Sequence, residues 1–222
     1  MQISQVLEIQ QENSSVKTST DTFSCQNIVV CAGGFSRKLL QTSGISIKTY
    51  FTHAEIIQTP PLDLKLHTLI MPANLQRPQL EAESSTNDKL WNENNQLAWI
   101  LDVGAVQFKN KSLCLGQISY INTNPDADFD SVKSEAALRE NIGKILPDLE
   151  NITGNFHHCL VTFSKDNLPL VGTVPQSNNI HGFSGFSNPL VVIPPLARRF
   201  ANYLTGNEDE IINSLSPKRF VS

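Results

Sequence analysis

A continuous apolar run that ends in two glycines constrains the fold of this chain more than any other feature. Residues 28–32 read Ile-Val-Val-Cys-Ala and are followed by Gly33 and Gly34. Such a run predicts a strand buried on both faces, as in a parallel sheet. A short helix over residues 35–41, entered at Ser36, should follow, and helix N-termini at this place in α/β proteins bind phosphate or ribose groups. The alternative is a tight strand-to-helix turn that needs glycine only for its geometry.

The composition excludes several classes of protein. The 222 residues carry 17 basic and 21 acidic side chains, for a net charge of −4, and no cluster of Lys or Arg. We therefore expect no nucleic-acid partner, because phosphate binding needs concentrated positive charge. No segment reaches the roughly 20 apolar residues of a membrane-spanning helix, and residues 1–15 lack the pattern of a signal peptide. The sequence indicates a cytoplasmic, mildly acidic globular protein.

Neither a disulfide framework nor a metal site is expected. The chain has four cysteines and no C-x-x-C pair: Cys25, Cys31, Cys114 and Cys159. Two of them lie in apolar, strand-like runs, which favours buried free thiols in a reducing compartment. His157 and His158 precede Cys159, but adjacent strand residues point to opposite faces of a sheet, and no further ligand recurs at a suitable spacing.

The order of the predicted elements indicates a mixed α+β fold. Apolar alternation predicts mostly antiparallel strands in the middle of the chain: residues 47–58, 66–71 and 97–118, the last with a turn near 109–112. The polar residues 72–95 read as an exposed loop or insertion. Asp130 or Ser131 caps a helix at about residues 131–146, and a final helix runs from about 194 to 204.

These elements predict two domains, one of them built from both ends of the chain. Residues 1–46 and 159–222 each contribute strands and a short helix to one layer, and residues 47–158 form an antiparallel domain between them. Neither end makes a complete β-α-β unit. The 11 glycines include no G-x-G, so the chain carries no dinucleotide-binding or phosphate-loop fingerprint.

Two further segments carry a chemical signal. Residues 163–172, Phe-Ser-Lys-Asp-Asn-Leu-Pro-Leu-Val-Gly, predict a tight polar turn that leads into a strand. Residues 182–190, Gly-Phe-Ser-Gly-Phe-Ser-Asn-Pro-Leu, predict a glycine-containing loop ahead of the last helix. Such a loop exposes backbone N–H groups, and the helix dipole favours anionic atoms there. An ordinary glycine-rich connection is the alternative.

Together, three segments resemble the D-amino-acid-oxidase-like family of FAD-dependent oxidoreductases, and glycine oxidases most closely. Residues 16–36 are similar to the family's strand pair and its A-G-[AG]-[WF]-S turn. Residues 164–172 are similar to its T-P-D-G-L-P-[VI]-[IV]-G turn, and residues 186–194 to the glycine-oxidase segment [YF]-R-N-G-[IV]-L-L-A-P. The order and the spacing of the three segments also match, so the resemblance spans essentially the whole chain.

The resemblance implies a two-domain flavoenzyme that oxidises the C–N bond of an amine or amino acid and passes electrons to oxygen or another acceptor. Residues 47–158 would be the substrate domain, and both ends the C-terminal remnant of a Rossmann-like FAD-binding domain. The resemblance implies three sets of contacts with FAD: Ile3, on a strand, at the adenine; Ala32 and Gly33 at the adenosine half; and Gly185, Phe186, Ser187, Asn188, Pro189 and Leu190 around the flavin pyrimidine edge. A helix N-terminus suits that edge, because reduced flavin carries negative charge there.

The sequence departs from the family's pattern at several places. The family's G-x-G-x-x-G unit lies before the first of these segments, so we expect this chain alone to bind little FAD, to be inactive or incomplete, and to associate with itself or with a missing N-terminal part. Ser187 replaces an Arg, and Pro189 replaces a Gly whose N–H could donate to the flavin. Val161 and Thr162 replace an Arg-Pro whose Arg pairs with the substrate carboxylate, which argues against an ordinary α-amino acid as substrate.

Other interpretations stay open at this point. A catalytically silent truncated scaffold, or a binding module of the same fold, is the alternative to an enzyme, and an unrelated α+β binding protein is a third possibility. Trp99 and Tyr120 lie in strands that the resemblance places near the substrate, where they would line the pocket, but ordinary packing aromatics fit the pattern as well. No residue is predicted to be catalytic.

Overall fold

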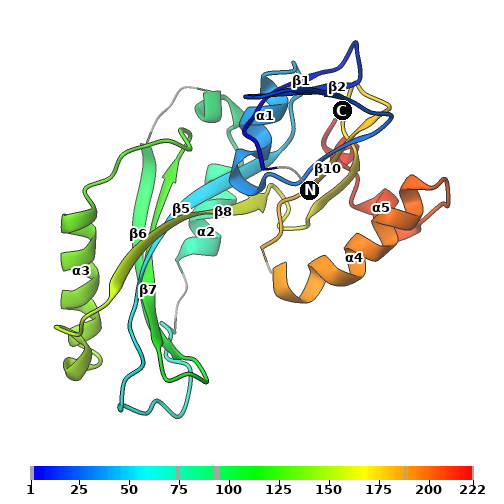
Figure 1. The fold of residues 1–222 in the computed structure, drawn as a ribbon. Coiled ribbons are helices and arrows are strands. Elements are labelled where there is room, and N and C mark those ends of the chain that lie inside the picture. Colours follow the sequence, from blue (N-terminus) through cyan, green and yellow to red (C-terminus); the bar gives the residue numbers. More distant parts are fainter. Residues whose placement is uncertain (1–2, 74–75, 93–95, 188, 222) are drawn as a thin grey trace. The chain divides into compact units, whose positions relative to one another are not determined.

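The computed structural model describes residues 3–73, 76–92, 96–187 and 189–221, without the side chains of 96–98. The chain divides into two compact units, residues 1–50 with 162–222 (unit 1) and residues 51–161 (unit 2), and the divisions fall inside two long strands. Figure 1 shows helices together with antiparallel-dominated sheets, which confirms the predicted mixed α+β class. Among the described residues, none of the helices combines the length and the apolar character that crossing a bilayer requires.

Unit 1 contains two small sheets. Its elements are β1 (Val6–Gln10), β2 (Ser15–Thr18), β3 (Thr22–Ser24), β4 (Ile28–Val30), a 3-10 turn (Gly33–Phe35), α1 (Ser36–Gln41), β9 (Leu170–Thr173), β10 (Ile180–Ser184), α4 (Pro189–Leu204), α5 (Glu210–Ser214) and a second 3-10 turn (Pro217–Phe220). The first three strands form an antiparallel meander, and the second sheet has the order β4-β10-β9. In that second sheet β4 and β10 are parallel, with Ile28 opposite Ile180, so their carboxyl ends lie at one edge.

One hydrophobic core of unit 1 lies where the two sheets and α1 meet, and another lies between β9, α4 and α5. Ile9, Leu40 and Leu170 are buried in the first of these cores. The run after residue 27 is not buried on both faces as predicted: Ile28 and Val30 are buried, but Val29 is 40% exposed. Within the described strands β4 pairs with β10 alone, and its three side chains alternate between the core and an exposed face.

Unit 2 is a four-stranded sheet between helices. Its elements are β5 (Thr49–Gln58), α2 (Arg77–Ser84), a 3-10 turn (Asp88–Asn92), β6 (Gln96–Gln107), β7 (Leu113–Asn122), α3 (Ser131–Gly143), a second 3-10 turn (Pro147–Leu149) and β8 (Asn155–Ser164). The strand order is β6-β7-β5-β8. Thr52 faces α2, to whose Glu81 it donates a hydrogen bond of 2.7 Å. Tyr120, which pairs with His53 on the opposite face, contacts Ser134 of α3.

The helix predicted at residues 131–146 is present as α3. Asp130 is its N-cap, since its carboxylate accepts from the backbone N–H of Lys133 at 3.0 Å. Ser134, Leu138 and Ile142 recur every four residues and are buried against the sheet. The helix ends at Gly143, earlier than predicted, because Pro147 starts a separate 3-10 turn.

Four local predictions are wrong. Residues 66–71 form no strand but one bridge, between Ile70 and Ala105. The polar stretch 72–95 contains α2 and a 3-10 turn, anchored by the buried Trp91. Helix α4 begins at Pro189 rather than near residue 194, and α5 follows it. The strand predicted to carry Ile3 begins only at Val6, and the Ile3 side chain is 92% exposed.

The four cysteines form no disulfide among the described residues, and the expectation that they are buried is wrong. Cys25, Cys31 and Cys159 are exposed, and Cys114 is half-buried. In the described part of the chain, no group of three or more His, Cys, Asp or Glu could hold a metal ion.

Candidate functional site

The turn after β4 has a backbone that only glycine adopts easily. Gly33 lies at φ +52° and starts the 3-10 turn that leads into α1. Ser184, the last residue of β10, donates its hydroxyl to the carbonyl of Gly33 at 3.3 Å. The parallel pairing of β4 and β10 therefore brings Ala32 and Gly33 next to the end of β10, at the carboxyl edge where open α/β sheets bind ligands.

The loop that follows β10 begins with a second left-handed glycine. Gly185 lies at φ +77°, and the loop runs through Phe186 and Ser187 into α4. The ring of Phe186 packs on Phe183 with centroids 4.7 Å apart, and Ser187 donates to the carbonyl of Asn167 at 3.4 Å. The first part of the predicted loop is thus held by two contacts, one from Phe186 to β10 and one from Ser187 to the turn at Asn167.

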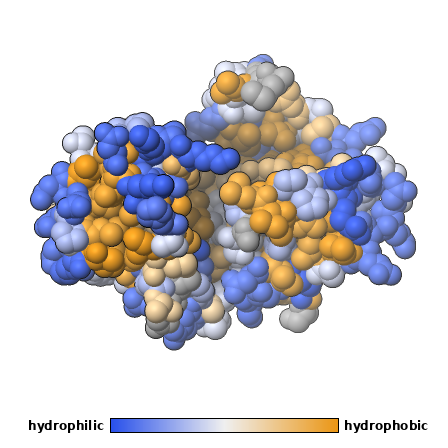
Figure 2. Space-filling model, turned by 90° about the horizontal axis from the view of Figure 1, so that it is seen from below, coloured by the Kyte–Doolittle hydropathy of each residue, from blue (hydrophilic) through white to orange (hydrophobic). Residues whose placement is uncertain are grey.

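The end of this loop exposes apolar side chains. Pro189 is the first residue of α4, a position where proline is tolerated because the first N–H groups of a helix have no partner within it. Leu190 is 89% and Val191 67% exposed, and Figure 2 shows apolar side chains at the surface amid hydrophilic ones. Asn188, the remaining predicted contact, lies outside the described residues.

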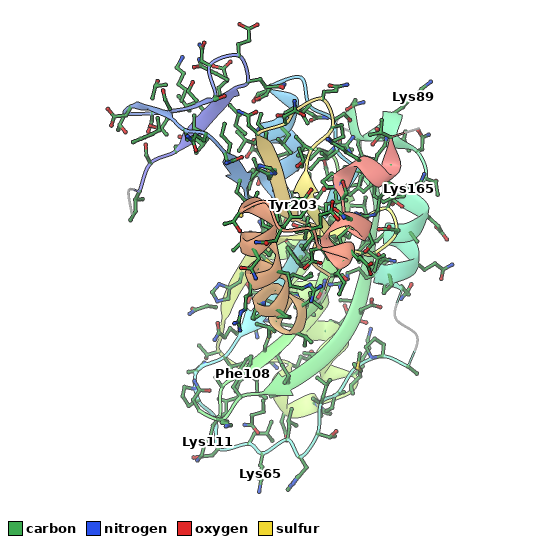
Figure 3. All side chains as sticks on the ribbon, turned by 90° about the vertical axis from the view of Figure 1, so that its right-hand side faces the viewer. Lys65, Lys89, Phe108, Lys111, Lys165 and Tyr203 are labelled. Atoms are coloured by element: carbon green, nitrogen blue, oxygen red, sulfur yellow. The ribbon has the colours of Figure 1, made fainter. Side chains whose placement is uncertain are left out.

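The turn over residues 164–169 contacts the loop after β10 through the hydrogen bond from Ser187 to Asn167. Asp166 accepts hydrogen bonds from the hydroxyl of Ser164 and the backbone N–H of Leu168. Arg219 donates to both of its carboxylate oxygens, at 2.9 Å each, and to the carbonyl of Leu168. Figure 3 labels Lys165 in this turn. Burial by itself would raise the pKa of Asp166, but the hydrogen bonds from Arg219 and its other partners outweigh burial and lower that pKa.

Replacing Asp166 with asparagine is expected to lower the free energy of unfolding by about 1–2 kcal/mol near neutral pH, because a charge-assisted pair is lost at a partly exposed site. The depressed pKa means that this contribution is present above about pH 4 and is lost as the pH falls further. Urea denaturation of wild type and Asp166→Asn measures the difference.

The matched control is Asp63→Asn. Asp63 is fully exposed and pairs with Lys111 at 3.3 Å, at the end of the β6–β7 hairpin (Figure 3). This exposed pair should contribute less than about 0.5 kcal/mol. Equal effects of the two substitutions would contradict the role given to Asp166.

Unit 2 contains a cavity of about 310 Å³ on the α2 face of its sheet. Its walls are mainly apolar and include Ile56, Ile70 and Met71. Arg77, the one basic side chain among the described lining residues, lies 3.4 Å from the carboxylate of Glu81. Burial raises the pKa of Glu81, while Arg77 and the hydroxyl of Thr52 oppose that rise.

Sequence reasoning missed this cavity because it took residues 72–95 for a loop. Asp102 of β6 accepts hydrogen bonds from the backbone N–H groups of Gln76 and Arg77, at 3.2 and 3.1 Å, and thereby caps α2 from 25 residues away. The local signal for the helix is Pro78, because proline favours the first turn of a helix.

The structure brings some predicted residues together and leaves others apart. Ala32 and Gly33 meet the end of β10, which leads directly into Gly185, Phe186 and Ser187. Ile3 belongs to neither turn. Trp99 and Tyr120 stack with ring centroids 6.2 Å apart and both line a second cavity, on the α3 face of unit 2.

This arrangement is typical of the class of α/β proteins that bind nucleotides: a parallel strand pair has glycine turns at its carboxyl edge, and a helix begins there. Comparison with protein-family models gives the same class. The family model "FAD dependent oxidoreductase" (DAO) matches residues 2–203. The chain belongs to this family of FAD-dependent oxidoreductases.

Solved structures of the same fold include glycine oxidase from Geobacillus kaustophilus, with 16% sequence identity, a TM-score of 0.71, and coverage of 99% of this chain and 53% of that one. Glycine oxidase from Bacillus cereus ATCC 14579 has 16% identity and a TM-score of 0.65, with 95% and 52% covered. L-proline dehydrogenase from P. horikoshii has 15% identity and a TM-score of 0.65, with 98% and 54% covered. No curated protein matches the sequence. The chain thus spans about half the length of these solved structures.

The residues of unit 1 fit part of an FAD molecule. Gly33 and Gly185 give the two turns a left-handed backbone, and α4 offers N–H groups at its start. Pro189 cannot donate one of them, and the 222 residues contain no G-x-G for the pyrophosphate.

Proposed function

We propose that this chain contributes the flavin-edge and substrate surfaces of an FAD-dependent oxidoreductase that oxidises the C–N bond of an amine. Unit 1 corresponds in this proposal to the FAD-binding part and unit 2 to the substrate domain. The observation that carries it is the continuous family match over residues 2–203, together with the two glycine turns that meet at one sheet edge.

The roles of the residues follow from their backbone groups. When bound, FAD supplies the acceptor for the hydride that leaves the carbon next to nitrogen. The N–H groups at the start of α4 stabilise negative charge at the pyrimidine edge, since the helix dipole is positive there. Gly185 through Leu190 would surround that edge, and Ala32 and Gly33 would contact the adenosine half.

The proposed substrate is an amine without an α-carboxylate. Val161 and Thr162 stand where the family's substrate-pairing Arg-Pro is expected, and neither carries a charge. In the unit 2 cavity, which we propose for the substrate, Arg77 is already engaged by Glu81. The apolar walls of this cavity favour the hydrocarbon part of such an amine.

The proposed location and partners rest on other residues. The free state of all four cysteines supports a cytoplasmic location. The exposed Leu190 and Val191 support self-association or a further polypeptide as partner.

The test starts from the coding sequence that precedes the codon of Met1. If a G-x-G-x-x-G segment is encoded there, in frame or as a separate polypeptide, the experiment expresses that segment together with this chain. We expect a yellow protein whose flavin is bleached anaerobically by amines. The 222-residue chain alone should hold little or no FAD, because the pyrophosphate would have no glycine-rich helix N-terminus. Visible absorbance measures the flavin content of the purified complex and of the 222-residue chain alone, and the bleaching of the flavin by amines.

A pair of glycine variants sharpens this test. Gly185→Val and Gly206→Val both force a side chain into left-handed backbone, at φ +77° and +95°. A Cβ at Gly185 would also lie 3.6 Å from Ser164 and Leu170, whereas nothing lies within 4 Å at Gly206. Gly185→Val should therefore cost more stability, and flavin content is measured per mole of folded protein. Only Gly185→Val should lower the flavin content, because Gly206 lies beyond the end of α4. Equal flavin loss in both variants would contradict the proposed loop.

The alternative is a catalytically silent scaffold of the same fold, which Pro189 and the absence of G-x-G favour. Either a colourless co-expressed complex or the lack of an upstream G-x-G-x-x-G segment would support it. Stoichiometric FAD in the 222-residue chain alone would instead overturn the predicted dependence on a second segment.

A further inference from the structure

The second cavity of unit 2 lies between the β6–β7 strands and α3. It has a volume of about 330 Å³, which is within the range of small-molecule sites. Its lining includes three aromatic residues and three charged ones: Trp99, Tyr120, Phe129, Asp128, Asp130 and Lys133. It is on the sheet face opposite to α2, so it is separate from the proposed substrate cavity.

The aromatic side of this cavity is fixed in place. The rings of Trp99 and Tyr120 stack at 6.2 Å, and those of Tyr120 and Phe129 at 4.4 Å. The buried His53 contacts the Phe129 ring at a steep angle, with centroids 4.7 Å apart. The Tyr120 hydroxyl is hydrogen-bonded to the hydroxyl of Ser134 at 2.7 Å. Trp99 is nevertheless 54% exposed, so an indole surface stays open to a ligand on a rigid support.

The charges at the cavity favour a cation. Asp128 and Asp130 are exposed, and neither forms an ion pair with any residue that the structure describes. Burial raises the pKa of the Tyr120 hydroxyl, and the nearby charges of Glu55 and Asp130 raise it further, while its bond to Ser134 opposes the rise. The positive end of the α3 dipole is offset by the Asp130 cap. Lys133 is the one opposing charge among the described lining residues.

We propose that this cavity binds an organic ammonium ion, which would lie on the face of Trp99 with its charge toward Asp128 and Asp130. Indole is the best of the protein rings for cation–π contacts, and quaternary ammonium ions are recognised by aromatic surfaces of this kind. The proposal is independent of the proposed redox function, because the two cavities share none of their described lining residues.

The probe is choline, compared with its neutral isostere 3,3-dimethylbutan-1-ol, which has the same shape and no charge. The chain has only two tryptophans, so Trp91→Phe leaves Trp99 as the single indole reporter. We expect a saturable change in Trp99 fluorescence with choline and at least about tenfold weaker binding of the alcohol. Equilibrium dialysis of labelled choline against the wild-type chain gives a reading that does not depend on the Trp91 substitution.

Charge variants identify the site. Asp130→Asn keeps an N-cap for α3, because asparagine caps helices about as well as aspartate. Together with Asp128→Asn it should weaken choline binding about tenfold or more, whereas Lys133→Met should strengthen it. Glu140→Gln removes a charge elsewhere on α3, where Glu140 pairs with Lys144, and should leave binding unchanged. Equal affinity for the neutral alcohol, no saturable choline binding to the wild-type chain, or unchanged binding in the double aspartate variant would each overturn the proposal.

Discussion

Replacing Leu138 with alanine is expected to lower the free energy of unfolding of unit 2 by about 2–5 kcal/mol. Leu138 is fully buried on α3 and belongs to the same core cluster as Leu113, Leu115 and Ile118 of β7. Deleting its isobutyl group removes buried apolar contacts and leaves a cavity that a sheet on one side and a helix on the other cannot easily close. Urea denaturation followed by tryptophan fluorescence reports on this unit, because both Trp91 and Trp99 belong to it.

The control for this experiment is on the same helix. Val132 is 78% exposed, so Val132→Ala should change the free energy of unfolding by no more than about 0.5 kcal/mol. Both variants replace a branched apolar residue of α3 with alanine, and they differ mainly in burial. A Leu138→Ala protein as stable as Val132→Ala would show that α3 is not packed on the sheet in this way.

Acidification should destabilise unit 2 through His53. This side chain is fully buried, its Nε2–H donates to the carbonyl of Asn124 at 3.0 Å, and its Nδ1 accepts from His158 at 2.8 Å. Burial is the main cause that lowers its pKa to about 4, and the charge of His158 adds to it, while Asn124 and Asp126 act in the opposite direction. The folded protein therefore keeps His53 neutral over a range where the unfolded chain binds a proton.

The sign and size follow from the two pKa values. The contribution of His53 to stability is fully present above the unfolded value of about 6.5 and is lost as the pH falls toward 4. Since one pKa unit corresponds to about 1.4 kcal/mol, the loss amounts to about 3 kcal/mol. Glu55, which is buried nearby and whose pKa is raised by burial, acts in the opposite direction, so only a difference between variants isolates the histidine.

His53→Asn supplies that difference. Asparagine does not titrate, and its side-chain oxygen can take the place of Nδ1 as acceptor from His158, although the bond from Nε2 to the Asn124 carbonyl is lost. The unfolding free energy of this variant should change less between pH 6.5 and pH 4.5 than that of wild type. His67→Asn, at an exposed histidine, should follow the wild-type profile. If the His53 and His67 variants had the same pH dependence, the neutral buried histidine would be the wrong explanation.

Local signals in the sequence account for the elements that could be predicted. The turn near residues 109–112 between two alternating runs predicts the β6–β7 hairpin, and Asp130 ahead of an apolar stripe predicts α3. Both depend on residues close together in the chain. Helix α2 was missed, because the side chain that caps it, Asp102, belongs to strand β6 and not to the residues just ahead of the helix, and Pro78 was its one local signal. The adjacent Pro194 and Pro195 suggested a helix start, but they lie inside α4.

In the candidate site too, the local features could be predicted from the sequence and the long-range contacts could not. The glycines at positions 33 and 185 stand out in the sequence, and both have left-handed backbone in the structure. That they meet through Ser184 depends on the parallel pairing of two strands far apart in the chain, which no local pattern specifies. The flavin contacts assigned to Ile3, Ala32, Gly33 and residues 185–190 stay predictions. Trp99 and Tyr120 were expected at a substrate pocket, but the aromatic cavity under α3 as a whole was not predicted, because its walls come from three separate segments.

The pairing of Ile28 with Ile180 has a consequence for the order in which the protein is made. Among the described strands β4 pairs with β10 alone, so β4 leaves the ribosome before unit 2 but can pair in this sheet only after β10 has emerged. By then every residue of unit 2 has already emerged, and its four strands and two helices can pack. Domains generally fold as units during synthesis, so unit 2 should fold first, while β4 of unit 1 waits for the C-terminal segment that completes its sheet.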